Sequence, residues 1–139
     1  MCWPTAGTVD AAAGQGWPGL WSVLFTAERA VMALVQATSF AEGLDLIWLA
    51  EDLTDACEDI RVRHPGEVSD ATAADLGPLP ADGDLDSARQ TVAHLIASAI
   101  RRIDELSVVT TDPSALLWLA GSGTSLFAAR TRLVTAGVR

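Results

Sequence analysis

The most constraining feature of the sequence is a set of apolar residues that recur every three or four positions in four separate stretches. The pattern is clearest in residues 87–107. Its members are Val92, Leu95, Ile96, Ala99, Ile100, Ile103 and Leu106. This spacing places the side chains on one face of an α-helix. No stretch shows the alternation of apolar and polar residues that is typical of a β-strand. The sequence therefore predicts an all-α protein.

Three further stretches have the same spacing, and we expect helices over residues 20–38, 39–63 and 113–135. The predicted core residues of the first are Leu20, Val23, Leu24, Ala27, Val31, Leu34 and Thr38. Those of the second are Leu46, Leu49, Ala50, Leu53, Ala56, Cys57 and Ile60. Those of the last are Leu116, Leu119, Ala120, Gly123, Phe127 and Val134. Each helix then has an apolar face to bury against the others.

Capping signals mark the starts of three of these helices. Ser39 with Glu42, and Ser87 with Gln90, have the spacing of a capping box, in which each side chain satisfies a free amide of the first turn. Asp112 precedes a proline, which favours a cap followed by the first helical residue. The helix starts are therefore predicted from polar residues as well as from apolar spacing.

The length of 139 residues suits a single domain. Residues 1–18 form a tail rich in glycine, alanine and threonine, and its Trp3 and Trp17 predict that it packs on the helices. Residues 19–139 form the helical domain. A long loop follows the second helix over residues 65–85, with one helical turn expected around residues 70–76. We expect a single-domain four-helix bundle with up-down-up-down topology.

The net charge of −9 makes nucleic acids and anionic membranes poor partners. Arg101 and Arg102 are closely followed by Asp104 and Glu105, which is typical of a mixed-charge helix surface. The only two cysteines form no CxxC motif, so a zinc site is not expected. No signal peptide is recognisable, and Glu28 and Arg29 interrupt the longest apolar run. These features predict a cytoplasmic protein.

An acidic row on the second helix is the most interesting chemical feature. Glu51, Asp55 and Glu58 recur on adjacent turns of one face, and carboxylates at this spacing can bind Mg²⁺ or Mn²⁺. Residues 51–55 resemble the first acidic segment of helical nucleotide pyrophosphohydrolases, which would imply metal-activated attack of water on phosphorus. The second acidic segment of that family is missing here. The alternative interpretation is a solvated helix face, with no cofactor.

Apolar residues also lie away from the predicted core. Phe40, Leu44 and Trp48 form a row with four-residue spacing. In the last helix Trp118 precedes two small residues of one face, Ser122 and Ser125. Large aromatic and small residues together favour contact with another helix or subunit. Packing of the two tail tryptophans over these residues is the alternative.

Arg130 falls on the expected core face of the last helix. It could extend its charged end into water, pair with an acid such as Glu28, or bind an anionic ligand. No catalytic combination of residues is evident. We therefore expect an interaction module that self-associates or binds a protein partner. The alternatives are a divalent-metal phosphate-ester hydrolase and a bundle that binds a small apolar ligand.

Overall fold

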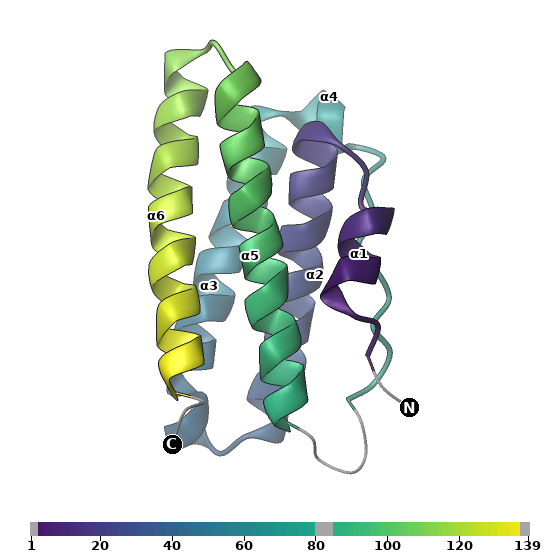
Figure 1. Cartoon of the computed structure of the whole chain (residues 1–139), viewed down its shortest axis with the longest axis vertical. Coiled ribbons are helices and arrows are strands. Elements are labelled where there is room, and N and C mark those ends of the chain that lie inside the picture. Colours follow the sequence, from purple (N-terminus) through teal and green to yellow (C-terminus); the bar gives the residue numbers. More distant parts are fainter. Residues whose placement is uncertain (1–2, 80–84, 137–139) are drawn as a thin grey trace.

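The computed structural model describes residues 3–79 and 85–136, and all regular secondary structure in these ranges is helical. The all-α prediction is confirmed. Four long helices lie side by side in Figure 1, with the short helices α1 and α4 beside them. The helices are α1 (Ala6–Ala12), α2 (Gly16–Ala37), α3 (Phe40–Arg63), α4 (Pro65–Val68), α5 (Leu85–Val109) and α6 (Pro113–Ala136).

The directions of the long helices differ from the expected order. Arg63 at the end of α3 donates a hydrogen bond to Ser114 at the start of α6, at 3.1 Å. Near the end of α5, Arg102 reaches the Gly14 carbonyl just before α2, at 2.6 Å. The ends of α3 and α5 therefore lie at the same end of the molecule, so these two helices run in the same direction (Figure 1). The up-down-up-down topology is not confirmed, because the segment after α4 runs along α2 toward the end of the molecule at which α5 begins (Figure 1).

The helical turn expected around residues 70–76 is wrong. The short helix lies earlier, at α4, and residues 71–79 contain no helix. Proline at the first position of α4 explains this start, since its fixed φ suits a first helical residue. The residues after α4 instead follow α2 in a non-helical conformation.

Two buried hydroxyl groups of α2 hold this non-helical segment. Ser22 Oγ donates to the Thr72 carbonyl at 2.6 Å, and the Ala74 amide donates to Thr26 Oγ1 at 3.0 Å. Thr26 Oγ1 also donates to the Ser22 carbonyl at 2.8 Å. Buried polar groups need such partners, because an unsatisfied one costs about 1–3 kcal/mol. The segment thus completes the core beside α2, a role that the sequence did not indicate.

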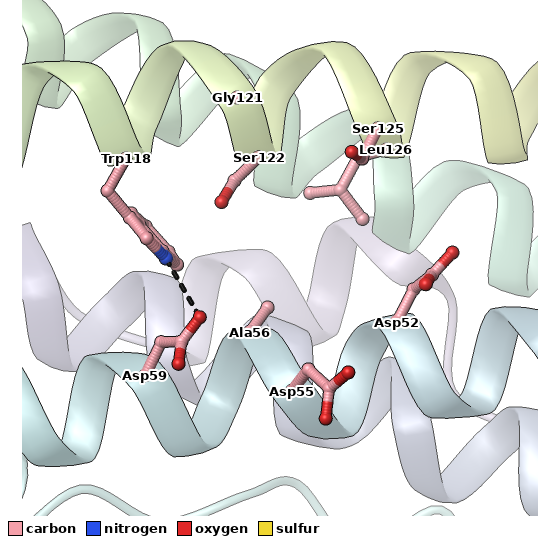
Figure 2. Close-up of a pocket in the computed structure, with 9 residues that line it drawn as sticks. All are labelled: Asp52, Asp55, Ala56, Asp59, Trp118, Gly121, Ser122, Ser125 and Leu126. Carbon is pink, nitrogen blue, oxygen red and sulfur yellow. Dashed lines mark hydrogen bonds between the residues drawn. The ribbon is translucent and has the colours of Figure 1, made fainter.

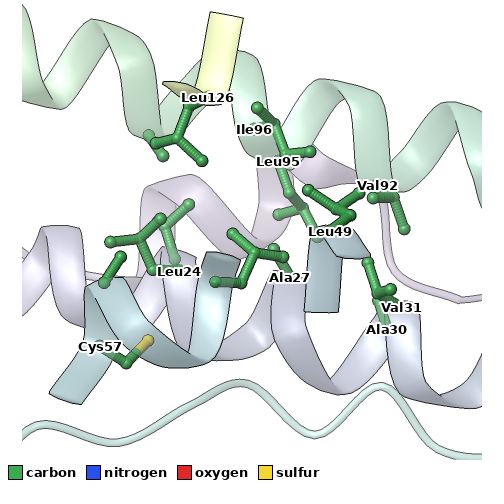
Figure 3. Close-up of a cluster of buried hydrophobic side chains, with 14 of the residues drawn as sticks. Leu24, Ala27, Ala30, Val31, Leu49, Cys57, Val92, Leu95, Ile96 and Leu126 are labelled. Atoms are coloured by element: carbon green, nitrogen blue, oxygen red, sulfur yellow. The ribbon is translucent and has the colours of Figure 1, made fainter. Parts of the chain in front are cut away.

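The core confirms the predicted faces of α2, α3 and α5. The seven expected residues of α3 are all buried, as are six of the seven expected in α2. The exception is Thr38, which lies beyond the last residue of α2 and is partly exposed. Figure 3 shows side chains from these helices meeting with Leu126 of α6. Burial of each leucine side chain stabilises the fold by about 1.5–3 kcal/mol.

The face of α6 that was predicted to be buried is wrong. Phe127 and Val134 are exposed, and Leu119 is the only fully buried member of the expected set. The residues that α6 buries are Ala115, Leu119, Leu126, Ala129 and Leu133. Their spacing is regular only if the polar Ser122 is included on the same face. Because a serine interrupts the row and an aromatic residue lies outside it, the apolar pattern pointed to the wrong side.

The N-terminal tail packs on the long helices, as expected, but it also contains a helix. Trp3 and Trp17 are both buried. Thr5 caps α1 by accepting a hydrogen bond from the Thr8 amide at 3.2 Å. Trp17 already belongs to α2, which begins at Gly16. The boundary expected at residue 18 therefore does not coincide with a helix start.

The capping predictions have different outcomes. Asp112 caps α6 by accepting a hydrogen bond from the Ala115 amide at 3.0 Å, which confirms that prediction. The capping box at Ser87 is wrong, because α5 has already begun at residue 85. Helix α3 begins directly after Ser39, as expected. The Glu42 side chain, the other half of that predicted box, lies outside what the structure describes, and so do the side chains of residues 135 and 136.

Helix α2 is long and apolar enough to cross a membrane by those two measures alone. Half of its most apolar window is buried within the protein. A membrane-spanning helix and the core helix of a soluble protein both meet these two criteria.

Candidate functional site

The outer face of α3 carries an uncovered row of apolar side chains. Phe40, Leu44 and Trp48 are exposed by 77%, 42% and 57% respectively. They lie on successive turns because they are four residues apart. The opposite side of the helix is occupied by buried leucines such as Leu49 and Leu53, so the row cannot turn inward. We call these three residues the apolar row.

The same outer side of α3 becomes acidic after the apolar row. Asp52 follows Trp48 by one turn, and Asp55 and Asp59 follow in the next two turns. All three aspartates are exposed. In the described ranges no arginine forms an ion pair with any of them. The face is therefore apolar in its first half and negatively charged in its second.

A groove of about 360 Å³ lies between this acidic half and α6. Helices α3 and α6 pack against each other less extensively than either packs against its other long neighbour. Figure 2 shows the aspartates on one wall and the α6 side chains on the other. The groove is lined by Asp52, Asp55, Ala56, Asp59, Trp118, Gly121, Ser122, Ser125 and Leu126. Small residues of α6 face short side chains of α3, and this leaves the space open.

Trp118 forms one end of the groove in a fixed position. Its Nε1 donates a hydrogen bond to Asp59 Oδ2 at 3.1 Å. The other side of its ring approaches Trp17, with ring centres 5.9 Å apart. Trp17 in turn stacks on His64, with centres 3.9 Å apart and planes 19° apart. The indole is thus held by contacts with α3 and with the start of α2.

The residues of the predicted interface are divided between two places. Trp118, Ser122 and Ser125 line the groove, whereas the apolar row lies outside it. The alternative that tail tryptophans cover these surfaces holds in part, because Trp17 contacts Trp118. The apolar row remains exposed.

The predicted metal ligands are not gathered into one site. Glu51 and Asp55 line a second hollow of about 300 Å³ between α2 and α3, and Glu58 is not part of it. Glu58 instead forms an exposed ion pair with Arg61 at 2.6 Å. Within residues 3–79 and 85–136, no group of three histidine, cysteine, aspartate or glutamate residues could hold a metal ion. The described geometry gives the metal prediction no support.

Arg130 lies away from the groove. Its Nε is buried and has no hydrogen-bond partner, while the residue as a whole is partly exposed. It forms no ion pair with Glu28. It lines neither the groove nor the hollow between α2 and α3. Ligand binding by Arg130 remains a prediction from the sequence.

A charge cluster around the buried Arg102, between α1 and α5, was not predicted. Arg102 is 7% exposed, and its Nε donates to Asp10 Oδ1 at 2.8 Å. Arg101 pairs with Asp10 Oδ2 at 2.6 Å, and Ser98 donates a further hydrogen bond to Asp10. The interpretation of Arg102 as part of a mixed-charge surface is wrong. Its position three residues after Ala99, within the apolar face of α5, was the available signal.

Among the described residues, Asp10 and Cys57 have shifted pKa values. Burial would raise the pKa of the Asp10 carboxyl, but hydrogen bonds from Ser98 and Arg102 and the positive charges of Arg102 and Arg101 together lower it. Burial raises the pKa of the Cys57 thiol to about 12, with a smaller effect from nearby glutamates. A thiol of this kind is not ionised near neutral pH, so Cys57 has the properties of a core residue and not of a nucleophile.

No protein-family model, curated protein or solved structure matches this chain. The chemistry of the site therefore rests on its own geometry. The uncompensated aspartates of the groove repel phosphates and attract cations. The apolar row presents aromatic and aliphatic side chains to solvent.

Proposed function

We propose that this protein is a four-helix-bundle interaction module that self-associates through the apolar row of α3. The observation that carries the proposal is the exposure of Phe40, Leu44 and Trp48 on successive turns of one helix. Isolated exposed apolar residues are normal on protein surfaces, but a contiguous group marks an interaction site.

The composition of the row supports this function. Tryptophan and phenylalanine are enriched at protein interfaces, and buried tryptophans often contribute much of the binding energy. The described N-terminal residues pack elsewhere, since Trp3 and Trp17 join the core and α1 lies against α5 and α2. No described segment of the chain covers the apolar row.

The oligomeric state in solution tests the proposal. We expect light scattering after gel filtration to give a dimer for the wild type, and a monomer for Leu44→Asp, because a buried carboxylate without a partner is strongly unfavourable. Leu117→Asp is the matched control, since Leu117 is exposed on α6, away from the row. It should remain a dimer.

Circular dichroism must show that both variants are folded. A monomeric wild type at about 100 µM, a concentration at which even an interaction of roughly −8 kcal/mol would be saturated, would contradict self-association.

A second candidate function is the binding of an organic cation in the groove. Its support is the combination of aspartates without arginine partners and the indole of Trp118, which can contact a cation through its ring face. This differs from the apolar ligand expected from the sequence, because one wall of the groove is charged.

A thermal melt with spermidine, a linear triamine, tests this second function. We expect a saturable rise in Tm for the wild type and none for Asp52→Asn/Asp55→Asn. Asp70→Asn/Asp104→Asn changes the net charge equally and should respond like the wild type. An equal response of all three proteins would indicate charge screening alone. The same melt with Mn²⁺ or Mg²⁺ tests the metal expectation.

A further inference from the structure

We infer that residues 69–79, which we call the strap, form a cover over α2 that opens and closes while the long helices stay packed. The strap follows α4 and runs along the outer side of the molecule (Figure 1). Its opening does not depend on the proposed self-association, which uses the apolar row of α3.

The strap covers buried groups but is not itself buried. Ser22 and Thr26 of α2 lie beneath it and are 5% and 0% exposed. No residue from 69 to 79 is buried to this degree. Its larger apolar side chains, Leu76 and Leu79, are partly exposed. The strap is therefore a single layer of chain with solvent on its outer side.

Two hydrogen bonds join the strap to α2. Ser22 Oγ donates to the Thr72 carbonyl at 2.6 Å, and Thr26 Oγ1 accepts from the Ala74 amide at 3.0 Å. The two hydroxyls lie one turn apart on α2, and the two strap groups belong to alternate residues. Within residues 3–79 and 85–136 we find no other hydrogen bond between the strap and a long helix.

Water can replace both of these hydrogen bonds. When the strap leaves, the hydroxyls of Ser22 and Thr26 become accessible to water, and so do the Thr72 carbonyl and the Ala74 amide. The net stabilisation from such bonds is small, because the separated groups are hydrogen-bonded to water instead. Leucines at positions 22 and 26 would hold the strap by burial of apolar surface, which water opposes. The hydroxyls of α2 therefore make the contact reversible.

The contacts on either side of this layer are of a different kind. Leu20, Val23 and Leu24 of α2 are fully buried, and α2 packs along both α3 and α5. Val68 of α4 is 5% exposed and joins the same core just before the strap begins. Segments with few buried contacts open at a lower free energy than the core. Opening therefore begins after Val68 and leaves the long helices in place.

Thiol labelling tests this opening within one molecule. The parent protein is Cys2→Ser, and Ser22→Cys adds a thiol beneath the strap. The buried Cys57 of α3 is the internal reference for opening of the core. We expect the introduced thiol to react with an aromatic disulfide reagent at least about 100-fold faster than Cys57. Its rate should change little with urea below the unfolding transition, whereas that of Cys57 should rise steeply, because global unfolding exposes far more surface.

Two further substitutions separate the strap from the core. Thr26→Val keeps the side-chain shape but removes the acceptor of the Ala74 amide, so labelling at position 22 should become about fivefold to tenfold faster. Ile103→Val weakens the packing of α5 on α6, where Ile103 approaches Gly123. It should accelerate labelling of Cys57 by about twofold to tenfold and leave labelling at position 22 unchanged, because the open and closed strap retain the same core.

Equal labelling rates with the same steep urea dependence would overturn the inference, since the strap would then leave only when the core unfolds. Acceleration of both thiols by Ile103→Val would have the same meaning. Hydrogen exchange of the wild type makes the comparison without a substitution. The Ala74 amide should exchange through an opening that depends little on urea, and the Leu95 amide of α5 through one that depends strongly on it. A monomeric wild type would contradict self-association and leave these expectations unchanged.

Discussion

The junction between α1 and α5 differs from the outer face of α3 in how its charged side chains are paired. At the junction the Arg102 guanidinium bonds the Asp10 carboxylate at 2.8 Å, the Asp10 carbonyl at 2.8 Å and the Gly14 carbonyl at 2.6 Å. On α3, Asp52 and Asp55 have no arginine partner in the described ranges, and an apolar row is exposed beside them. The charges of the junction are therefore paired within the protein, whereas Phe40, Leu44 and Trp48 of the α3 face remain exposed to solvent.

The glycines of the two regions show the same contrast. A Cβ atom at Gly19 would collide with the Arg102 guanidinium and with the Gly14 backbone. A Cβ atom at Gly121, in the groove, would meet nothing within 4 Å. The close approach of α1 and α2 to Arg102 therefore requires glycine. The groove has space that the fold does not use. The fold therefore requires glycine at position 19 but not at position 121.

The largest expected effect tests the junction. Arg102→Ala should lower the free energy of unfolding by about 2–4 kcal/mol, because it leaves the Asp10 and Gly14 carbonyls without their donor and removes one of the partners of the Asp10 carboxylate. Urea unfolding followed by tryptophan fluorescence measures this. Arg101→Ala removes a half-exposed partner of the same carboxylate and should cost no more than about 1 kcal/mol. Equal losses of free energy of unfolding in the two variants would contradict the expectation that the buried arginine contributes more than the exposed one.

The paired glycine substitutions should differ in sign. Gly19→Ala should destabilise the protein by about 1–3 kcal/mol, because the added methyl group displaces Arg102 or the backbone. Gly121→Ala should stabilise it by up to about 1 kcal/mol, since alanine favours the helix and has space. Thermal unfolding of the two variants provides the comparison. A destabilising Gly121→Ala would show that the groove is closed in solution.

The pH dependence of stability should also reveal the junction. The pKa of Asp10 is lower in the folded protein than its ordinary value of 3.8. The carboxylate therefore contributes stability above that value, and the contribution is lost as the pH falls through the lower, folded pKa. We expect the difference in free energy of unfolding between the wild type and Asp10→Asn to shrink between pH 5 and acid pH, at roughly 1.4 kcal/mol per proton and pH unit at most. A constant difference would contradict the ion pairs.

The smallest expected effect concerns the groove. Asp52→Asn/Asp55→Asn should change the free energy of unfolding by no more than about 0.5 kcal/mol, because both side chains are exposed and take no part in the ion pairs described here. Any change should be stabilising, since like charges are removed. Urea unfolding at low salt is the appropriate measurement. A loss above about 1 kcal/mol would mean that these aspartates support the fold.

The buried face of a helix could be predicted where apolar and polar residues lie on different sides of that helix. The core of α3 was located because acidic residues occupy the other side of its second half, and that of α2 because leucine and valine recur at regular helical spacing. Residues 113–129 of α6 include no charged side chain, so nothing in that stretch marked the solvent side. Its orientation depends on packing against α5, where Gly123 approaches Ile103. Which face of α6 is buried is therefore decided by packing against the other helices and not by its own sequence.

The candidate site was predictable only in part. The exposure of the apolar row followed from its position opposite the core face of α3. The groove could not be predicted, because it depends on which α6 residues face the aspartates. The sequence had indicated the wrong buried face for α6. The direction of α5 was also not predictable, since a connection as long as residues 69–84 permits either direction.

That connection sets a limit on chain length. Helix α5 has 25 residues and is therefore about 38 Å long. An extended chain covers at most about 3.6 Å per residue, so a return along this distance needs about 11 residues. Residues 69–84 exceed this by only a few positions. A deletion of more than about five of them would leave the connection too short to reach the start of α5 unless α4 or the end of a long helix unwinds.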